Sequence, residues 1–547
     1  MASESPAAGS QPTRVQQILR VLRPSHEHSA FSATVLLMGA VMVSRVIGYV
    51  REAYIAYAFG AGLQTDAYVA AFTLPDWLNY LVAGGTASIT FISIFSRYLS
   101  QKREAEAQKT FSVILTVMTT VLTVGVVVVA IYARPLERLL FPEFSEAQLD
   151  LCVFLTRILL PAQVFFYAGG IVSAVLLSRR MFLIPALGPL FYNVAIIAGG
   201  LLLGSRMGVA GLAVGAVVGA FLGPFLVNAI GARRTGIGYS VNFDVRDPAF
   251  REWVRLSIPL MLGVSLATAD DWILRYFASG EAGAITRLNY AKRLIAVPIA
   301  VLGQAAGQAS LPFFAKLWGE NKLHEFAASV NASIYRITAV CLLATTLLMA
   351  AALPMVDLVY RRGRFELADS RQTAIFFFWF AVALALWSVQ ALYSRAFYAA
   401  GNTVTPMIAT TLVTLASLPV YWVLFQRFST TGLAIASDIG ITANAVVLAI
   451  LLHRRRMVLL TDLPWGELGK ATVTGVVAGL LAARVSALVP VSESQSSSLA
   501  ALALAGITWA AAIAVGLWLT RSRLLTDLRR KKQPPGPGNP AEARSAL

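Results

Sequence analysis

Three charged residues interrupt an otherwise apolar stretch near the start of the chain. Arg45, Arg51 and Glu52 lie within LLMGAVMVSRVIGYVREAYIAYAFG, residues 36–60. A charge at the centre of a bilayer costs about 3 kcal/mol or more, so such residues serve a function or are paired. The planar guanidinium fork of arginine binds two phosphate oxygens at once. The stretch therefore predicts one wall of an anion-binding cavity, with snorkelling or a buried pair with Glu52 as the structural alternative.

Other apolar stretches also carry charges. Lys292 and Arg293 are adjacent cations with no acid nearby in sequence, which favours an anion site. Asp271 and Arg275 lie one helical turn apart and can pair within one helix. Asp270 has no obvious partner, so Asp270 and Asp271 are candidates for coupling transport to a cation, Na⁺ or H⁺.

Polar residues at the next apolar stretch are harder to assign. Asp66 follows Thr65 where a helix is expected to begin, and it is as well explained as an N-cap as by a functional role. Asn79 follows Pro75 and Asp76 within the same stretch. We expect Asp66 and Asn79 to line the cavity beside the arginines.

The composition indicates what kind of protein must position these groups. Of 547 residues, 57% are hydrophobic and 13% charged, with a mean hydropathy of +0.68. Soluble domains are about 45–50% apolar and 25% charged, so the pattern predicts an all-α polytopic membrane protein. The net charge of +17 lies mostly between apolar segments and at the C-terminus, so it does not indicate nucleic-acid binding. Two cysteines and four scattered histidines match no metal-ligand spacing, and no cofactor is expected.

A membrane span needs about 20 mostly apolar residues. On that criterion the sequence predicts fourteen spans: 31–58, 63–99, 108–133, 148–178, 182–203, 208–231, 252–278, 284–315, 328–359, 370–400, 405–427, 431–453, 468–489 and 498–520. Basic segments such as RYLSQKREAEAQK, SRRM and HRRRM follow even-numbered spans. Because Lys and Arg are enriched in cytoplasmic loops, both termini are predicted to be cytoplasmic. YRRGRFELADSR, after span nine, is an exception.

The sequence also contains an internal repeat. Pro185 and Pro406 are 221 residues apart, and so are the Gly-Leu-Ala motifs that begin at Gly211 and Gly432. Pro75 and Pro298 match at a spacing of 223. The repeat predicts two parallel six-span lobes, the arrangement of transporters that rock around a midplane site.

These observations predict the following domains: a cytoplasmic N-terminal segment (1–30), an N-lobe (31–235), a C-lobe (252–456), two extra helices (467–520) and a basic, then disordered, cytoplasmic tail (521–547). Spans one, two, seven and eight are equivalent in the two lobes and hold most of the buried charges. Prolines Pro75 and Pro298, with Gly84, Gly85 and Gly303, are expected to bend spans two and eight.

Three motifs resemble a known family. SRVIGYVREAYIAYAFGAGLQTDAYVAAFTLPDWL resembles the opening signature of the MurJ/MviN lipid II flippases of the MOP transporter superfamily. LNYAKRLIAVPIAVLGQAAGQASLPFFAKL and RAFYAAGNTVTP resemble two further motifs of that family, in the same order along residues 31–456.

The resemblance implies fourteen helices in two lobes around a cationic cavity. It implies transport of lipid II, the undecaprenyl pyrophosphate-linked peptidoglycan precursor, from the cytoplasmic to the periplasmic leaflet of the bacterial inner membrane. Arg45, Arg51 and Arg293 match the family's cavity arginines, and Glu52 and Asp66 match its acidic partners. The expected partners are this lipid-linked oligosaccharide, membrane lipids and cell-wall synthesis proteins.

The chain departs from the family pattern at three positions. Asn79 replaces a common arginine, Gly84 a glutamate, and Lys292 an aspartate. The cavity stays basic, but the cargo remains open between lipid II and another polyprenyl-linked glycan. A cation-coupled drug exporter would favour an acidic cavity. A membrane glycosyltransferase would need an acidic catalytic loop, which the short connections lack, and a non-transporting scaffold would leave the buried charges unexplained.

Overall fold

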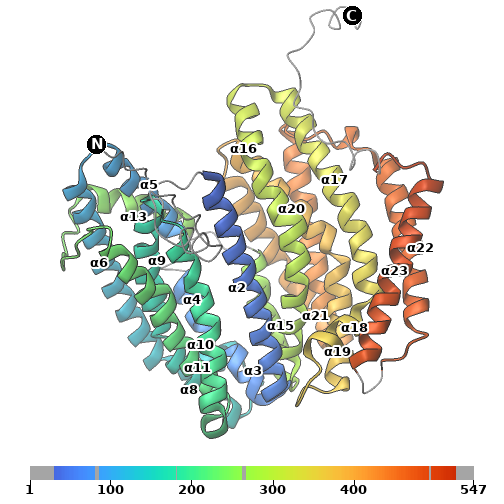
Figure 1. The fold of residues 1–547 in the computed structure, drawn as a ribbon, viewed down its shortest axis with the longest axis horizontal. Coiled ribbons are helices and arrows are strands. Elements are labelled where there is room, and N and C mark those ends of the chain that lie inside the picture. The colour runs from blue at the N-terminus through green and yellow to red at the C-terminus, as the bar shows by residue number, and fades with distance from the viewer. Residues whose placement is uncertain (1–29, 81–85, 180, 262–265, 492–494, 525–547) are drawn as a thin grey trace, which may run out of the picture. The chain divides into compact units, whose positions relative to one another are not determined.

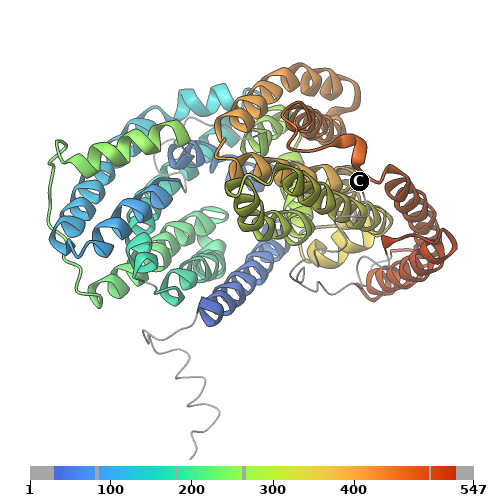
Figure 2. The same cartoon turned by 90° about the horizontal axis from the view of Figure 1, so that it is seen from above.

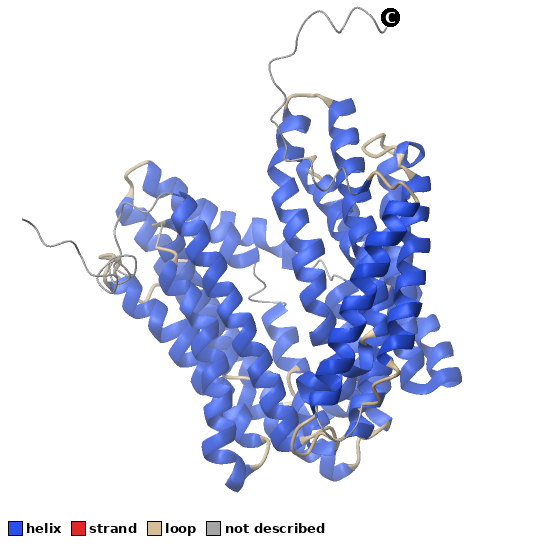
Figure 3. Cartoon of the chain, turned by 45° about the vertical axis from the view of Figure 1, so that its right-hand side comes forward, coloured by secondary structure: helices blue, strands red, loops and turns tan. Residues whose placement is uncertain are grey.

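The computed structural model describes residues 30–80, 86–179, 181–261, 266–491 and 495–524. Within these ranges the chain forms helices and loops and no strand (Figure 3). The described chain falls into two compact units. The first lies within Met1–Val264, Arg275–Thr286 and Arg362–Phe365, and the second within Ser265–Leu274, Arg287–Arg361 and Glu366–Leu547.

The first unit contains most of the helices of the N-terminal half (Figure 1). These are α2 (Ala30–Phe59), α3 (Leu63–Ala70), α4 (Thr73–Leu78), α5 (Thr86–Ser100), α6 (Glu104–Ile131), α7 (Ala133–Leu140), α8 (Glu146–Leu159), α9 (Ala162–Ser178), α10 (Leu183–Met207), α11 (Ala210–Ala220), a π-helix (Phe221–Val227), α12 (Asn228–Arg233) and α13 (Pro248–Met261). The chain passes between the units within α14 (Leu266–Phe277) and α15 (Ala284–Pro298).

The second unit continues with a π-helix (Ile299–Gln304), α16 (Ala305–Gly319), α17 (Leu323–Ala350), α18 (Ala352–Tyr360), α19 (Leu367–Val382), α20 (Leu384–Ala399), α21 (Val404–Arg454), α22 (Trp465–Ser486) and α23 (Gln495–Leu519). The last two helices lie side by side (Figure 2), and α22 also packs along α17. Gly479 allows this approach, because a Cβ there would come within 2.8 Å of Thr346 Cβ.

The expected class, an all-α polytopic membrane protein, is confirmed. Among the described residues, nine helices are long and apolar enough to cross a membrane, or ten if the bent pair α19 and α20 is one span. One of the nine, α21, covers two predicted spans, since its backbone breaks at Ser429, between 405–427 and 431–453. The three other predicted spans correspond to α2, to α3–α5 and to α13–α14, where breaks or undescribed residues interrupt the helix.

Backbone irregularities recur at the spacing of the sequence repeat. Gly208, between α10 and α11, has φ 57° and ψ −136°, and Ser429, 221 residues later, has φ 51° and ψ −142°. Lys102 and Asn321 have φ 59° and 58° just before α6 and α17, which are both 28 residues long. The two halves of the sequence therefore share a backbone pattern.

Helix irregularities lie close to the prolines that were expected to bend spans two and eight, and the bends themselves stay a prediction. A π-helix follows Pro298 directly, and residues 79–80 form a π turn shortly after Pro75. Gly303 is buried, and a Cβ there would meet Ser388 Cα at 2.8 Å. Gly84 and Gly85 lie outside the described residues.

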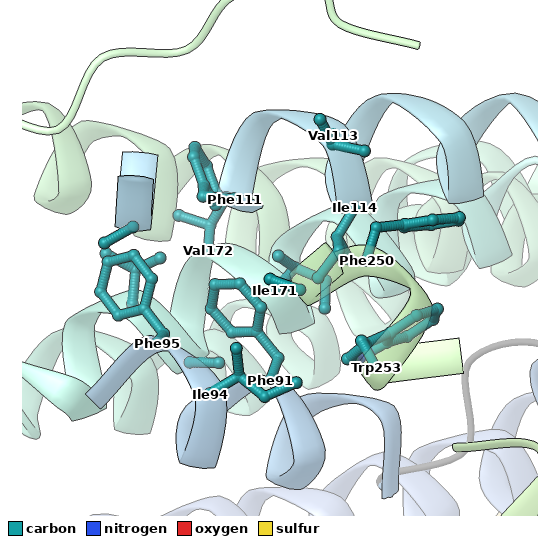
Figure 4. Close-up of a cluster of buried hydrophobic side chains, with 14 of the residues drawn as sticks. Phe91, Ile94, Phe95, Phe111, Val113, Ile114, Ile171, Val172, Phe250 and Trp253 are labelled. Carbon is teal, nitrogen blue, oxygen red and sulfur yellow. The ribbon is translucent and has the colours of Figure 1, made fainter. Parts of the chain in front are cut away.

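The core of the first unit is aromatic. Phe91 and Phe95 of α5 stack with ring centroids 5.1 Å apart, and Phe111 of α6 lies against them (Figure 4). Trp253 of α13 is 1% exposed in the same cluster. Within a membrane such packing holds helices by van der Waals contact rather than by removal from water, and this cluster joins α5, α6, α9 and α13.

Helices α10 and α11 touch through their backbones. A Cβ on Gly199 would come within 2.4 Å of the Gly211 carbonyl oxygen, and one on Gly215 within 2.5 Å of the Ala195 carbonyl oxygen. Only glycine permits this approach, which resembles the small-residue packing of membrane helices.

Candidate substrate-binding residues

Arg45 is exposed on α2, and its side chain forms no hydrogen bond or ion pair with the described part of the chain. Its neighbours Met42 and Val46 are also exposed, at 59% and 57%. A guanidinium on an apolar helix is too costly to leave against hydrocarbon, so it must reach water or an anion. Arg45 is therefore available to bind an anion, and its role as an anion ligand stays a prediction.

Arg51 is bound within the first unit. Its guanidinium forms an ion pair with Glu52, and its Nη1 donates to Asn193 Oδ1 of α10 over 2.8 Å. Asn193 is held in turn by a bond from its Nδ2 to the Pro189 carbonyl oxygen, 2.9 Å away. The Arg51 side chain is 12% exposed. The charge of Arg51 is thus compensated in this structure, which is the alternative that the sequence left open.

Asp66 caps a helix far away in sequence. Its carboxylate accepts from the backbone N–H groups of Gly283 and Thr286, at 2.5 and 2.8 Å, and from Thr286 Oγ1 at 2.6 Å. These donors form the first turn of α15, whose free N–H groups carry partial positive charge. Asp66 is 1% exposed, and α3, to which it belongs, begins with Gly62 as its N-cap. The Asp66 side chain therefore caps the N-terminus of α15 from outside and does not cap its own helix, α3.

Asn79 lies at the π turn that follows α4 and is partly buried. Its backbone N–H donates to the carbonyl oxygens of Asp76 and Pro75. Residues 81–85, which follow it, are not described. The structure therefore places Asn79 at the bend of this segment and leaves its proposed contact with substrate open.

A second charged cluster lies in the second unit, where α14, α15 and α21 meet. Lys292 Nζ donates to Asp270 Oδ2 over 2.5 Å and also forms an ion pair with Asp271. Asp270 is 1% exposed and accepts two more hydrogen bonds, from Ser437 Oγ over 2.9 Å and from the Tyr421 hydroxyl. Three donors thus surround one buried carboxylate.

This cluster corrects two expectations. Lys292 was expected beside Arg293 as part of an anion site without nearby acids, but its ammonium is shared by Asp270 and Asp271. Asp271 was expected to pair with Arg275, but Arg275 donates to Thr73 Oγ1 over 3.0 Å and lies 3.7 Å from Asp76. In both cases helix packing supplied partners far away in sequence, which the i,i+4 rule does not consider.

Arg293 is exposed on α15, about 100° around the helix from Lys292. It therefore lies on a different face of α15 from the paired ammonium. The fold also includes residues that the sequence analysis missed as partners: Asn193, Tyr421 and Ser437. Asn193 interrupts LFYNVAII as a polar residue in an apolar span, which was a usable signal. Tyr421 and Ser437 are common enough in membrane helices that no such signal existed.

Comparison with known proteins gives a consistent result. The family model described as lipid II flippase MurJ matches residues 55–504. The lipid II flippase MurJ of Burkholderia cenocepacia is 29% identical over 437 residues, which cover 78% of this chain and 84% of that protein. The probable lipid II flippase MurJ of Rhizobium tropici is 26% identical over 425 residues, 76% and 80% of the two chains.

Solved structures share the fold. A lipid II flippase MurJ in an inward closed conformation aligns with a TM-score of 0.74 and 19% identity, covering 89% of this chain and all of that one. An inward-facing multidrug resistance MATE transporter of the MOP superfamily aligns at 0.62 with 16% identity, covering 78% and 98% of the two chains. Because the family model spans most of the sequence, the chain belongs to the MurJ family of lipid II flippases, which are transporters and not enzymes.

Proposed function

We propose that this protein carries lipid II from the cytoplasmic to the periplasmic leaflet of the bacterial inner membrane by alternating access, as a step of peptidoglycan biosynthesis, cell wall formation and cell shape maintenance. The observation that carries the proposal is the family match over residues 55–504. Moving a lipid between leaflets needs no bond to be made or broken. The side chains must therefore bind and release the pyrophosphate rather than react with it.

Arg45 and Arg293 are the proposed primary ligands of the pyrophosphate. Both are exposed on helices that also carry apolar side chains. A bound pyrophosphate supplies the oxygens that the Arg45 guanidinium needs once water is excluded, and Arg293 is proposed to add a second guanidinium. Arg51 takes part by exchanging Glu52 for the substrate, with its guanidinium still held by Asn193 of α10. Asn79 is proposed to contact the same headgroup.

The orientation follows from the distribution of basic residues. Loops rich in Lys and Arg follow the even-numbered spans, which supports cytoplasmic termini. Cell-wall synthesis enzymes would then supply lipid II at the cytoplasmic face and consume it at the periplasmic face. Membrane lipids solvate the polyprenyl tail throughout. The cluster that contains Asp270 and Asp271 is proposed to link this transport to a cation.

The first test is flipping of lipid II by the purified protein in liposomes. Charge-assisted bonds contribute about 1.5–3 kcal/mol, so Arg45→Ala and Arg293→Ala should each slow transport roughly 10- to 100-fold. Arg45→Lys keeps the charge but not the fork and should fall in between. Arg206→Ala, an exposed arginine in the last turn of α10, is the matched control and should transport normally.

Unchanged transport in Arg45→Ala, Arg51→Ala and Arg293→Ala would rule out the arginine mechanism. Rescue of cells depleted of their own lipid II flippase tests the cargo separately. Lys292 adds a positive charge between Asp270 and Asp271, where an aspartate would add a negative one. The test therefore includes a second candidate cargo besides lipid II. Failure to rescue, together with flipping of another polyprenyl pyrophosphate glycan in liposomes, would identify that alternative.

A further inference from the structure

Asp438 of α21 is a buried carboxyl group without a hydrogen-bond donor in the described part of the chain. Both of its carboxyl oxygens are inaccessible to solvent, and the residue is 8% exposed. It lies nine residues beyond the break at Ser429, about 13 Å along the helix, and thus well inside a membrane-spanning segment. An unpaired carboxylate at such a place carries a desolvation cost of several kcal/mol.

The neighbourhood of Asp438 makes ionisation still less favourable. Ser437, the residue before Asp438, donates directly to Asp270 over 2.9 Å, so the two carboxyl groups lie on neighbouring positions of the same helix contact. Asp270 is stabilised as a carboxylate by Lys292, Tyr421 and Ser437. Asp438 has no comparable donors. When two carboxyl groups interact in a poorly solvated place, the one with fewer donors keeps the proton.

The other ionisable groups around this position do not change the balance. On α14 and α15 they are Asp270, Asp271 and Lys292, which neutralise one another in part. Tyr421 is a phenol that already donates to Asp270. The helices packed on α21 carry ionisable groups near their ends: Asp369 and Arg371 in the first two turns of α19, and Tyr393 and Arg395 in the last two turns of α20.

From this arrangement we propose that Asp438 is a proton-binding site and that Lys292 is the resident counter-ion of Asp270, so that the ion exchanged here is H⁺ and not a metal cation. A carboxylate with hydroxyl oxygens would suit a hard cation. Here, however, the Lys292 ammonium already occupies the Asp270 and Asp271 oxygens.

The proton has a defined effect on the second unit. Loss of the proton from Asp438 adds a negative charge to α21 next to Ser437, the residue that contacts Asp270 of α14, so the two carboxylates repel each other. Uptake of a proton removes that repulsion between α14 and α21. Coupling of this step to transport rests on the proposed flippase function, whereas the protonation itself does not.

Infrared spectroscopy of the full-length protein in lipid tests the protonation directly. In a Glu137→Gln background, which removes the other buried carboxyl that holds a proton near neutral pH, we expect a C=O stretching band of a protonated carboxyl that shifts in D₂O and is lost when Asp438→Asn is added. Asp357→Asn is the control, because Asp357 is also buried but pairs with Arg361 Nε over 2.8 Å and accepts from Ser498. This control should keep the band.

Two further variants keep the test decisive. Asp438→Glu should move the band without abolishing it, and it serves if the asparagine variant does not fold. Lys292→Met removes the counter-ion of Asp270, so a second protonated-carboxyl band should appear. A band that survives unchanged in both Asp438 variants would refute the proposal.

A transport experiment in liposomes distinguishes this inference from the flippase proposal. With K⁺ replacing Na⁺ on both sides, an imposed pH gradient should accelerate lipid II flipping several-fold in the native protein and not in Asp438→Asn. Flipping that requires Na⁺ and ignores the pH gradient would overturn the inference but leave the flippase proposal. No flipping under any condition would overturn the flippase proposal, while the infrared result would still decide the protonation of Asp438.

Discussion

At the scale of single residues, Asp66 shows how one carboxylate can fix two distant segments. It lies on α3 and accepts three hydrogen bonds from the start of α15, across more than 200 residues of sequence. Each bond to a charged group contributes about 1.5–3 kcal/mol, and a buried carboxylate left without donors is costly. Asp66 is therefore a structural link within the first unit, whatever further part it has in transport.

Glu137 provides a pH-dependent prediction. It lies on α7, between the spans of α6 and α8, and is fully buried. Burial raises the pKa of Glu137 from 4.5 to about 7, although Thr156 Oγ1 donates to it over 2.6 Å. In this interval the folded protein binds more protons than the unfolded chain, so stability falls as pH rises from about 4.5 to about 7. The loss is roughly 3 kcal/mol at most.

Glu137→Gln should remove this dependence. The variant should be more stable than the native protein above pH 7 and show a flatter profile below it, measured as melting temperature against pH in detergent. Glu143→Gln, an exposed acid on the same connection, should behave like the native protein. A Glu137→Gln profile that parallels the native one would show that Glu137 does not titrate in this range.

Residue types were easier to predict than residue partners. The sequence identified Arg45, Arg51, Asp66 and Asp270 as unusual, because a charged residue in an apolar stretch can be recognised without knowledge of the fold. It could not predict that Asp66 caps α15, because two of the three donors are backbone N–H groups, which have no sequence signature. Lys292 was misassigned for a related reason, since its acids lie 21 and 22 residues earlier on another helix.

At the scale of helices, the break in α21 carries strain that its counterpart avoids. Ser429 adopts φ 51° and ψ −142°, a region that glycine occupies readily and other residues do not. The equivalent position in the first half is Gly208. Ser429→Gly should therefore raise stability by about 1–2 kcal/mol, and Gly208→Ser should lower it by a similar amount. Thermal unfolding in detergent measures both.

A third substitution controls for the general effect of glycine. Ser205 is exposed within the regular helix α10, so Ser205→Gly should destabilise by about 1 kcal/mol or less. Opposite signs for Ser429→Gly and Ser205→Gly are the expected result. If Ser429→Gly were also destabilising, the strained backbone at the break would not be a property of the folded protein.

Helix boundaries could be predicted where chain breakers mark them and not elsewhere. The break between 405–427 and 431–453 was placed within two residues of Ser429, because polar residues separate two apolar runs. The prediction of one span over 328–359 was wrong in its second half: α17 ends at Ala350, and α18 follows as a separate helix. Pro354, in the first turn of α18, was an available signal for that break, and the span prediction ran over it.

At the scale of the whole molecule, the repeat makes a topological prediction. Lys102 and Asn321 precede equivalent helices, α6 and α17, and should lie on the same side of the membrane. Glu143, on the connection between α6 and α8, should lie on the opposite side. Both native cysteines, Cys152 and Cys341, are buried, so introduced cysteines can be labelled against a low background.

In intact cells, a membrane-impermeant maleimide should label Glu143→Cys, and it should label Lys102→Cys and Asn321→Cys only after permeabilisation. Labelling of Lys102→Cys and Asn321→Cys from opposite sides would contradict the parallel repeat. Labelling of both from outside would reverse the orientation and leave the repeat intact.

The glycine contacts between α10 and α11 have a mechanical consequence. Where the two backbones are in direct contact, no side chains lie between the helices that could change rotamer and let one helix slide past the other. We therefore expect α10 and α11 to move as one rigid body during any conformational change. Bending within the first unit is then expected at its π-helical segments, such as residues 79–80 and Phe221–Val227, where the regular α-helical hydrogen bonding is already interrupted.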